Sequence, residues 1–347
     1  MSKEVTIGKV TIGNGHPIAI QSMSNLPTTN VDAVVSQALQ LQNAGCDILR
    51  VAVKTQDCCK AIKLIKDKVD MPIVADVHFD YRLAVSSLEN GADKIRINPG
   101  NVSADAVATI VECAKTHNAP IRIGVNGGSV AKEFLQKYDN KVDAMVQNLL
   151  AYVRLFESKE FDNLVLSLKS SSIVETVMAN RLISKLTNYP LHVGVTEAGP
   201  YPQALVKNAI GIGALLLDGI GDTIRVSATA DPLVEIQSAK EILTSIGKYN
   251  LAEFVSCPKC GRCNVDLESI ATKVYEKVKN IDKKVKIAVM GCEVNGPGEC
   301  ADADLGMAGG NGKFAFFKHG KVYKTVKEDV ALDEFFKEID LLIEDKF

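Results

Sequence analysis

The chain has 347 residues, of which 46% are hydrophobic and 24% charged, and its formal net charge is −2. This length allows a large domain plus a smaller one, and the composition is ordinary for a soluble globular protein. The small net charge excludes a strong global attraction to nucleic acid or an anionic membrane, and the low aromatic content of 5% disfavours a stacking surface for single-stranded nucleic acid.

No segment resembles a signal peptide, and no run approaches the roughly 18 apolar residues of a membrane span. We therefore expect a cytoplasmic protein. A reducing compartment would keep the nine cysteines available as free thiols for metal binding or redox chemistry.

Residues 3–20 predict a small β-hairpin ahead of the main domain. From about residue 18 to residue 227, short β-branched runs alternate with helical patterns. One of these helices, residues 31–45, ends at Gly45, which is a typical helix stop. The eight runs that predict strands are residues 18–23, 47–53, 72–77, 93–98, 120–125, 163–168, 191–195 and 222–227.

This alternation predicts parallel strands joined by crossover helices. Eight such units within roughly 210 residues favour a closed (β/α)8 TIM barrel, an α/β fold, over an open doubly wound sheet. No GxGxxG motif opens the first helix, which weakens the dinucleotide-binding alternative. We expect the hairpin to cover the bottom of the barrel, where the strands begin.

A second, smaller α+β domain is predicted after the barrel. Residues 236–249 predict the last barrel helix, and a cysteine-rich region begins at residue 256. The further elements expected are a helix at about 266–279, a strand at 285–290, a glycine-rich turn at 307–313, a strand pair within 314–326 and a closing helix from Leu332. We therefore divide the chain into a substrate-binding barrel, residues 1–250, and a small domain, residues 251–347.

Polar side chains occur where several predicted strands end. The pairs spaced by two, whose members face the same side of a strand, are Asp76 with His78, Arg96 with Asn98, and Arg225 with Ser227. Other polar residues in or just beyond the second half of a predicted strand are Arg50, Arg122, Asn126, Lys169 and Glu197. A TIM barrel keeps its active site at this end of its strands.

The cations among these residues are Arg50, Arg96, Arg122, Lys169 and Arg225. They would repel one another unless an anion neutralised them, and guanidinium groups match phosphate oxygens. Because one phosphate needs about two or three such groups, the set indicates a diphosphate. The alternative is a group of ion pairs that fills the barrel mouth. Asp76 and Glu197 are candidates for proton transfer or for binding hydroxyls, and His78 is either their partner or a structural residue.

Three cysteines outside the barrel form a second candidate site. Two residues separate Cys257 from Cys260, and Cys292 follows a predicted strand about thirty residues later. Zinc prefers a second, separate CxxC or an HxxxH, and neither is present outside the run of residues 257–263. Three thiolates and one weaker ligand suit a [4Fe–4S] cluster, and the turn at residues 295–298 delivers Glu299 as that ligand. A zinc site and free buried thiols are the alternatives.

These motifs resemble the bacterial family of 4-hydroxy-3-methylbut-2-enyl diphosphate synthases of the non-mevalonate isoprenoid pathway. The stretches that carry the resemblance run along nearly the whole chain: PIAIQSM, AGCDILRVAV, ADVHFD, KIRINPGN, RIGVNGGS, LKSS, GVTEAG, GIGDTIRVS, SCPKCGR and GCEVNGPGE. The resemblance implies a TIM barrel joined to a ferredoxin-like iron–sulfur domain.

The activity implied is the reductive ring opening and dehydroxylation of 2-C-methyl-D-erythritol 2,4-cyclodiphosphate, with two single electrons from reduced flavodoxin or ferredoxin. The resemblance also implies a homodimer in which the cluster of one subunit serves the barrel of the other. By position, Asp76, His78 and Glu197 would face the carbon skeleton, and Glu197 is the first candidate proton donor.

The implied ligands of the [4Fe–4S] cluster are Cys257, Cys260, Cys292 and Glu299. The implied diphosphate-binding residues are Arg50, Arg96, Arg122, Lys169, Arg225 and Ser227, supported by Asn98 and Asn126. Cys263 and Cys300 depart from the family pattern, and either thiol could compete with Glu299 for the fourth iron.

Two other classes of protein remain as alternatives. A phosphate-binding TIM-barrel lyase or aldolase with a zinc-stabilised C-terminal domain would use Lys169 as a Schiff-base lysine. An iron–sulfur regulator would need a basic surface for nucleic acid, and the sequence has no basic stripe.

Overall fold

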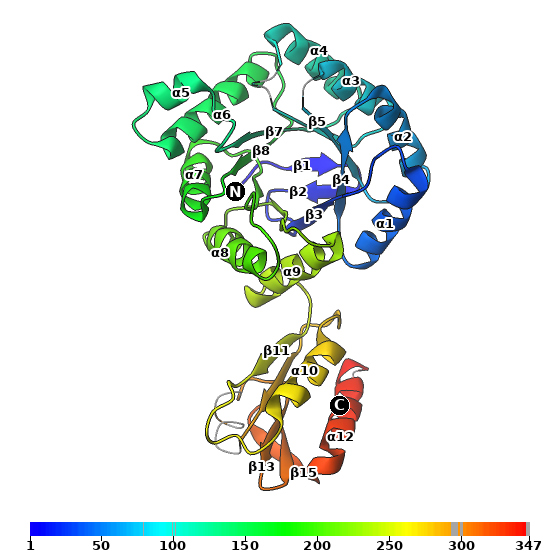
Figure 1. The fold of residues 1–347 in the computed structure, drawn as a ribbon, viewed down its shortest axis with the longest axis vertical. Coiled ribbons are helices and arrows are strands. Elements are labelled where there is room, and N and C mark those ends of the chain that lie inside the picture. The colour runs from blue at the N-terminus through cyan, green and yellow to red at the C-terminus, as the bar shows by residue number, and fades with distance from the viewer. Residues whose placement is uncertain (79, 99, 101, 293–297, 299–300, 345–347) are drawn as a thin grey trace. The chain divides into compact units, whose positions relative to one another are not determined.

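The computed structural model of the chain describes residues 1–78, 80–98, 100, 102–292, 298 and 301–344. The chain divides into two compact units, Met1–Ile246 and Gly247–Phe347, and each is described by itself (Figure 1). Among the described residues, no helix has the length and apolar character needed to cross a membrane.

The first unit opens with a hairpin of β1 (Val5–Ile7) and β2 (Val10–Ile12), which pair antiparallel. Figure 1 shows this hairpin lying across the ring of the other strands. Its apolar side chains form one buried cluster with residues near the amino ends of those strands, namely Ala19, Ile48, Val74 and Val165. The prediction that the hairpin covers the bottom of the barrel is confirmed, and the physical reason is this shared apolar contact.

Eight parallel strands form the barrel within the described part of the chain. They are β3 (Ala19–Met23), β4 (Ile48–Val53), β5 (Ile73–Val77), β6 (Lys94–Ile97), β7 (Ile121–Asn126), β8 (Leu164–Lys169), β9 (His192–Val193) and β10 (Thr223–Ile224). Their order in the sheet is β8-β7-β6-β5-β4-β3-β10-β9, and a parallel bridge between Leu166 and Leu191 joins its two edges. The predicted TIM barrel is therefore confirmed.

The strands β9 and β10 are shorter than predicted. The sequence predicted residues 191–195 and 222–227, but only two residues of each join the ladder. Beyond them the two backbones come very close, because a Cβ at Gly194 would lie 2.4 Å from the carbonyl oxygen of Arg225. Glycine at this position allows that approach.

Helices surround the strands, as Figure 1 shows. They are α1 (Val31–Asn43), α2 (Gln56–Lys66), α3 (Tyr81–Glu89), α4 (Ala104–Thr116), α6 (Lys141–Glu157), α7 (Ile173–Leu186), α8 (Gln203–Leu217) and α9 (Pro232–Ser245), with a short α5 (Lys132–Lys137) between β7 and α6. The predicted range of the last helix, 236–249, was wrong. Asp231 caps this helix by accepting a hydrogen bond from the Leu233 N–H at 2.8 Å, and Pro232 suits its first turn.

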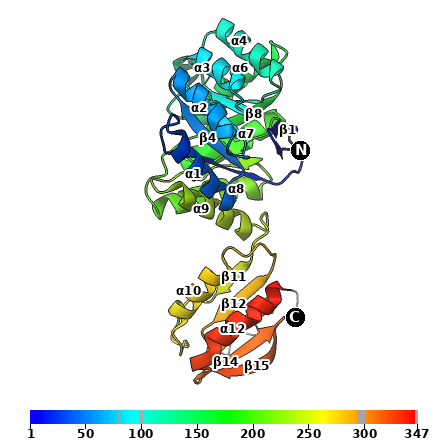
Figure 2. The ribbon, with the colours of Figure 1, turned by 90° about the vertical axis from the view of Figure 1, so that its right-hand side faces the viewer.

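The second unit is an α+β fold (Figure 2). Its described strands and helices are β11 (Glu253–Ser256), α10 (Leu267–Val278), β12 (Lys286–Met290), β13 (Leu305–Gly310), β14 (Lys313–Lys318), β15 (Lys321–Lys327) and α12 (Glu328–Ile343). The strands lie in chain order: β11, β12 and β13 are parallel, and β14 and β15 continue antiparallel. Side chains of both helices share one core cluster with Phe314 and Phe316 of the sheet.

In the second unit two predicted ranges were wrong and one strand was missed. Most of the glycine-rich stretch predicted as a turn, 307–313, belongs to β13, where Gly309 leaves room for the ring of Phe314, its register partner on β14. The turn is only Asn311 and Gly312, with φ of 51° and 73°, which suits a two-residue hairpin. Strand β11 was not predicted, and the closing helix begins at Glu328 instead of Leu332.

Candidate active site

A pocket of about 390 Å³ lies at the carboxyl ends of the barrel strands, and we call it the barrel pocket. It is lined by Met23, Arg50, Asp76, His78, Arg96, Arg122, Gly124, Asn126, Ser167, Lys169, Val195, Thr196, Glu197, Arg225 and Ser227. Every barrel residue predicted for the site is in this lining except Asn98. The Asn98 Oδ1 accepts a hydrogen bond from the Gly100 N–H at 3.3 Å instead.

The register of the strands brings these side chains together. Arg96 on β6 pairs with Asp76 on β5 and with Arg122 on β7, so three charged residues lie side by side. In the same way Met23 on β3 pairs with Arg50 on β4. Because successive residues alternate between the two faces of a strand, these residues all point inward.

Asp76 is the centre of an ion-pair network in the barrel pocket. Its carboxylate lies 3.2 Å from Arg96 Nη1 and 3.8 Å from Arg50 Nε. His78 Nε2 is 3.5 Å from Asp76 Oδ2 and 2.9 Å from Arg96 Nη1. Burial alone would raise the pKa of this carboxyl, but the hydrogen bond with His78 and the arginine charges outweigh burial, so the pKa of Asp76 lies below its ordinary value. Asp76 is therefore an anion that orients cations and not a proton donor at neutral pH.

The barrel pocket nevertheless has more positive charge than Asp76 can balance. Arg122 is only 3% exposed, and its Nε and Nη1 have no hydrogen-bond partner among the described residues. Burial and repulsion from Arg50 and Arg96 lower the pKa of Arg122 well below its ordinary value. The Nε of Arg225 is also buried without a partner in the described structure. Buried donors of this kind are expensive unless an acceptor is present, so this pocket suits an anion with several oxygens.

Lys169 faces the same surplus of positive charge. Its pKa is lowered well below the ordinary value, first by burial and then by repulsion from Arg122 and Arg50. Its Nζ lies 3.2 Å from the Nε2 of His192, a fully buried residue of β9. Among the described residues, Lys169 therefore contacts the imidazole of His192 and is surrounded by the arginine side chains of the pocket.

Several residues that shape the site were not predicted from the sequence. Met23 Sδ accepts a hydrogen bond from Arg50 Nη2 at 2.9 Å, and Glu235 on α9 lies 3.5 Å from Arg225 Nη2. The alternation of inward side chains could have identified Met23, and also Ser167, which precedes Lys169 by two. No pattern in the sequence indicates Glu235 or His192, because one reaches the site from a helix and the other lies beneath the pocket.

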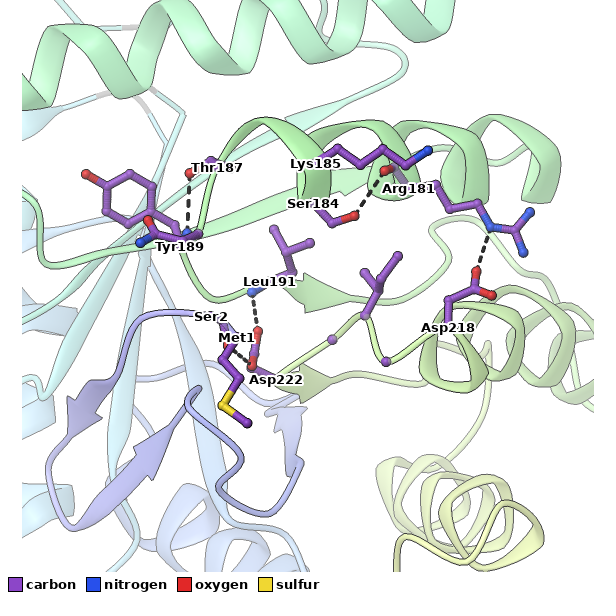
Figure 3. A pocket seen from close by; sticks show the side chains of 14 residues that line it. Met1, Ser2, Arg181, Ser184, Lys185, Thr187, Tyr189, Leu191, Asp218 and Asp222 are labelled. Carbon is purple, nitrogen blue, oxygen red and sulfur yellow. Dashed lines mark hydrogen bonds and ion pairs between the residues drawn. The ribbon is translucent and has the colours of Figure 1, made fainter.

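A larger pocket of about 700 Å³ lies at the opposite end of the barrel, near the amino ends of β9 and β10 (Figure 3). Three of its charged side chains already have partners: Arg181 Nε is 2.6 Å from Asp218 Oδ2, and Asp222 accepts hydrogen bonds from Ser2 Oγ and the Leu191 N–H. Because TIM barrels use the other end for catalysis, we assign the candidate active site to the barrel pocket.

In the second unit, Cys257, Cys260, Cys263 and Cys292 line a pocket of about 200 Å³, which we call the cysteine pocket. The loop after β11 carries the first three thiols, and Cys292 follows β12, the parallel neighbour of β11. Hydrogen bonds from Arg262 lower the pKa of Cys260, which favours its thiolate. Glu299 and Cys300 lie outside the described residues.

The donors of the cysteine pocket are soft thiols, and the Gly291 N–H donates to Cys257 Sγ at 3.3 Å, as sulfur ligands of clusters often require. Within the described ranges, no three His, Cys, Asp or Glu side chains are arranged around a single ion position. The soft sulfur donors of Cys257, Cys260, Cys263 and Cys292, gathered in one pocket, fit an iron–sulfur group.

The fold and the two pockets define a TIM-barrel enzyme that carries a second, cysteine-bearing domain. The barrel is similar to solved dihydropteroate synthases from Yersinia pestis (TM-score 0.51, 12% identity) and Stenotrophomonas maltophilia (TM-score 0.53, 14% identity), each covering 71% of this chain and 99% of the other. At such identities the likeness concerns the fold alone.

The chain belongs to the GcpE family: residues 2–240 match the GcpE TIM-barrel domain and residues 253–341 match the GcpE protein C-terminal domain. A relative in Caldicellulosiruptor saccharolyticus is 50% identical over 98% of both chains, and one in Caldanaerobacter subterraneus is 48% identical over 100% of this chain and 98% of its own. Both are named 4-hydroxy-3-methylbut-2-en-1-yl diphosphate synthase (flavodoxin). The resemblance stated from the sequence motifs is confirmed, and the lyase or aldolase alternative gains no support.

Proposed function

We propose that this protein converts 2-C-methyl-D-erythritol 2,4-cyclodiphosphate to 4-hydroxy-3-methylbut-2-enyl diphosphate by reductive ring opening and dehydroxylation, with electrons from reduced flavodoxin or ferredoxin. The names of the relatives support the reaction and the flavodoxin. The observation in this chain that carries the proposal is the buried guanidinium of Arg122, whose Nε and Nη1 lack a partner among the described residues of a strongly cationic pocket.

The diphosphate would occupy the cationic part of the barrel pocket. Arg50, Arg96, Arg122 and Arg225 supply paired N–H donors, and Lys169 adds a compact charge. Asn126 and Ser227 line the same pocket and would complete the set, whereas Asn98 is left as a support from outside the lining. Asp76 balances only part of the charge and keeps Arg50 and Arg96 in place.

The carbon skeleton would face His78 and Glu197. Glu197 lines the pocket with its backbone in the left-handed region, at φ 55°, which is uncommon for a residue with a side chain. We assign to Glu197 the delivery of the proton that the departing hydroxyl needs to leave as water, because its side chain lines the same pocket as the diphosphate-binding residues.

Cys257, Cys260 and Cys292 would hold a [4Fe–4S] cluster, with Glu299 as the fourth ligand. Such a cluster supplies electrons one at a time when it is bound. Cys260 is already biased toward the thiolate by Arg262. Cys263 lines the same pocket and, like Cys300, could compete with Glu299.

A homodimer and a cytoplasmic location complete the proposal. The resemblance of the sequence to its family supports a dimer in which the cluster of one subunit serves the barrel of the other. Neither nucleic acid nor a membrane is an expected partner, given the formal net charge of −2.

Anaerobic purification followed by iron and sulfide analysis, and then a product assay with the cyclodiphosphate and a one-electron reductant, tests the proposal. We expect a coloured protein that forms the alkene product. A colourless protein that contains zinc and forms a borohydride-trapped adduct at Lys169 would overturn it in favour of the lyase or aldolase.

A further inference from the structure

A buried histidine lies directly beneath the lysine of the barrel pocket. His192 is 0% exposed, and its Nε2 lies 3.2 Å from the Nζ of Lys169 on β8. Its other nitrogen, Nδ1, lies 2.7 Å from the Oγ1 of Thr223, which is the register partner of His192 on β10. Three adjacent strands thus form a chain of polar groups that ends at a residue of the pocket.

The protons of this chain can be assigned from its chemistry. Burial and then repulsion from Lys169 and Arg122 lower the pKa of His192 well below its ordinary value, so the imidazole is neutral. A neutral imidazole has one donor and one acceptor nitrogen, and an ammonium group can only donate. When Lys169 is charged, Nε2 therefore accepts from its ammonium group, and the Nδ1–H donates to Thr223.

The backbone at Gly194 also limits the space around the Lys169 amine. A Cβ at Gly194, two residues after His192, would lie 2.9 Å from Lys169 Nζ, so the glycine leaves room for the amine in its present position. The charged groups that act most strongly on Lys169 are Arg122, Arg50, Arg225 and Arg96, all of them cations around the barrel pocket. Asp76 and Glu197 are the acidic residues that line the same pocket. The acceptor nitrogen of His192 is in direct contact with the amine and favours its charged form.

We propose that His192 is a positioning residue for substrate binding: its neutral imidazole, oriented by Thr223, accepts a hydrogen bond from Lys169 and holds the ammonium group in place for the anionic end of the substrate. The inference rests on the proposed function in that it takes this anion to be the diphosphate. Binding of the anion then takes up a proton wherever Lys169 is neutral in the free protein, so affinity rises as the pH falls through the pKa of that lysine.

Two substitutions of His192 separate positioning from structure. His192→Leu removes the acceptor, and His192→Gln keeps a side-chain oxygen that can accept from Lys169. The probe is inorganic diphosphate, titrated anaerobically into the full-length, cluster-loaded protein. We expect His192→Leu to weaken binding about tenfold or more and to shift the pH dependence of binding to lower pH, with His192→Gln much closer to the unchanged protein. In turnover, KM should rise while kcat changes little, because the contact is made before and during the reaction.

A double-mutant cycle with Lys169→Met tests whether His192 acts through the lysine. His192→Leu should have no further effect on diphosphate binding in the Lys169→Met background. An equal loss in both backgrounds, or equal affinity of the Leu variant and the unchanged protein, would overturn the inference. If His192→Leu does not fold, two measurements test the inference instead. The diphosphate affinity of the Gln variant should be close to that of the unchanged protein, and the affinity of the unchanged protein should rise as the pH falls. Failure of the proposed function looks different, because the unchanged protein would then bind diphosphate but not convert the cyclodiphosphate.

Discussion

The barrel pocket takes its side chains from strands all around a nearly closed sheet, whereas the cysteine pocket takes its thiols from two loops that follow neighbouring strands. In the barrel, register and inward alternation set the position of each cation before any ligand binds. In the second unit, only the starting points of the loops are fixed by β11 and β12. The first site is therefore preorganised and destabilised by its own charge, whereas the thiols of the second site lie on loops that the proposed cluster would hold in place.

The largest effect is expected when a proposed cluster ligand is removed, because this should disable the cysteine pocket and leave the barrel pocket unchanged. Cys292→Ser should remove the bound iron and sulfide and lower reductive turnover by roughly 100-fold or more, because a cluster ligand is lost. Binding of inorganic diphosphate by the barrel pocket should stay unchanged in the same preparation. Metal analysis, visible absorbance and calorimetry measure these three quantities. A variant that keeps its iron and its turnover would contradict the cluster assignment.

Arg122→Met should weaken diphosphate binding without lowering the stability of the free protein, because the buried cation favours binding and opposes folding. We expect diphosphate affinity to fall by about 100-fold, since two charge-assisted hydrogen bonds are lost. The melting temperature of the free protein should not fall, because the substitution removes a buried cation with unpartnered donors. Arg154→Met on the exposed face of α6 is the matched control and should leave affinity unchanged. A lower melting temperature with unchanged diphosphate affinity would contradict the assignment of Arg122 to anion binding and show that it stabilises the fold.

Asp76→Asn should have the opposite effect on stability. Removing the carboxylate leaves Arg50 and Arg96 without their buried partner, and we expect the free energy of unfolding to fall by about 3 kcal/mol. The folded pKa of Asp76 is lower than the unfolded value of about 3.9, so its contribution is fully present above pH ~4 and is lost as the pH falls through the folded pKa. Denaturant titrations of both proteins at several pH values measure this difference. A difference that grows on acidification would contradict the assignment.

The smallest effect is expected in the cysteine pocket at Cys263. Its Sγ already lies 3.4 Å from the Val265 carbonyl oxygen, and it is close to the backbone of Gly291. Cys263→Ser should therefore leave iron content and turnover nearly unchanged, whereas Cys260→Ser should lose both. If Cys263→Ser loses the cluster instead, Cys263 and not Glu299 is the fourth ligand.

The sequence alone determined the number and direction of the barrel strands and most of the barrel pocket. The reason is local: a polar residue two positions from another on a buried parallel strand faces the same side, and the fold then collects all such residues at one end. The spacing rule found Asp76, Arg96 and Arg225, and a position within or just beyond the second half of a predicted strand found Arg50 and Lys169. The spacing rule also proposed Asn98, which the structure places outside the pocket lining because its side chain accepts a hydrogen bond from the Gly100 backbone.

Only the tertiary structure decided which groups oppose one another across the barrel. His192 contacts Lys169 through the joining of β8 to β9, and Glu235 reaches Arg225 from a helix that follows the strand. Such contacts depend on how successive elements pack against one another in space, and the spacing of residues in the sequence does not encode that packing. In the same way β11 is a strand because β12 lies beside it, since Glu253–Ser256 is too short to form a strand without a partner.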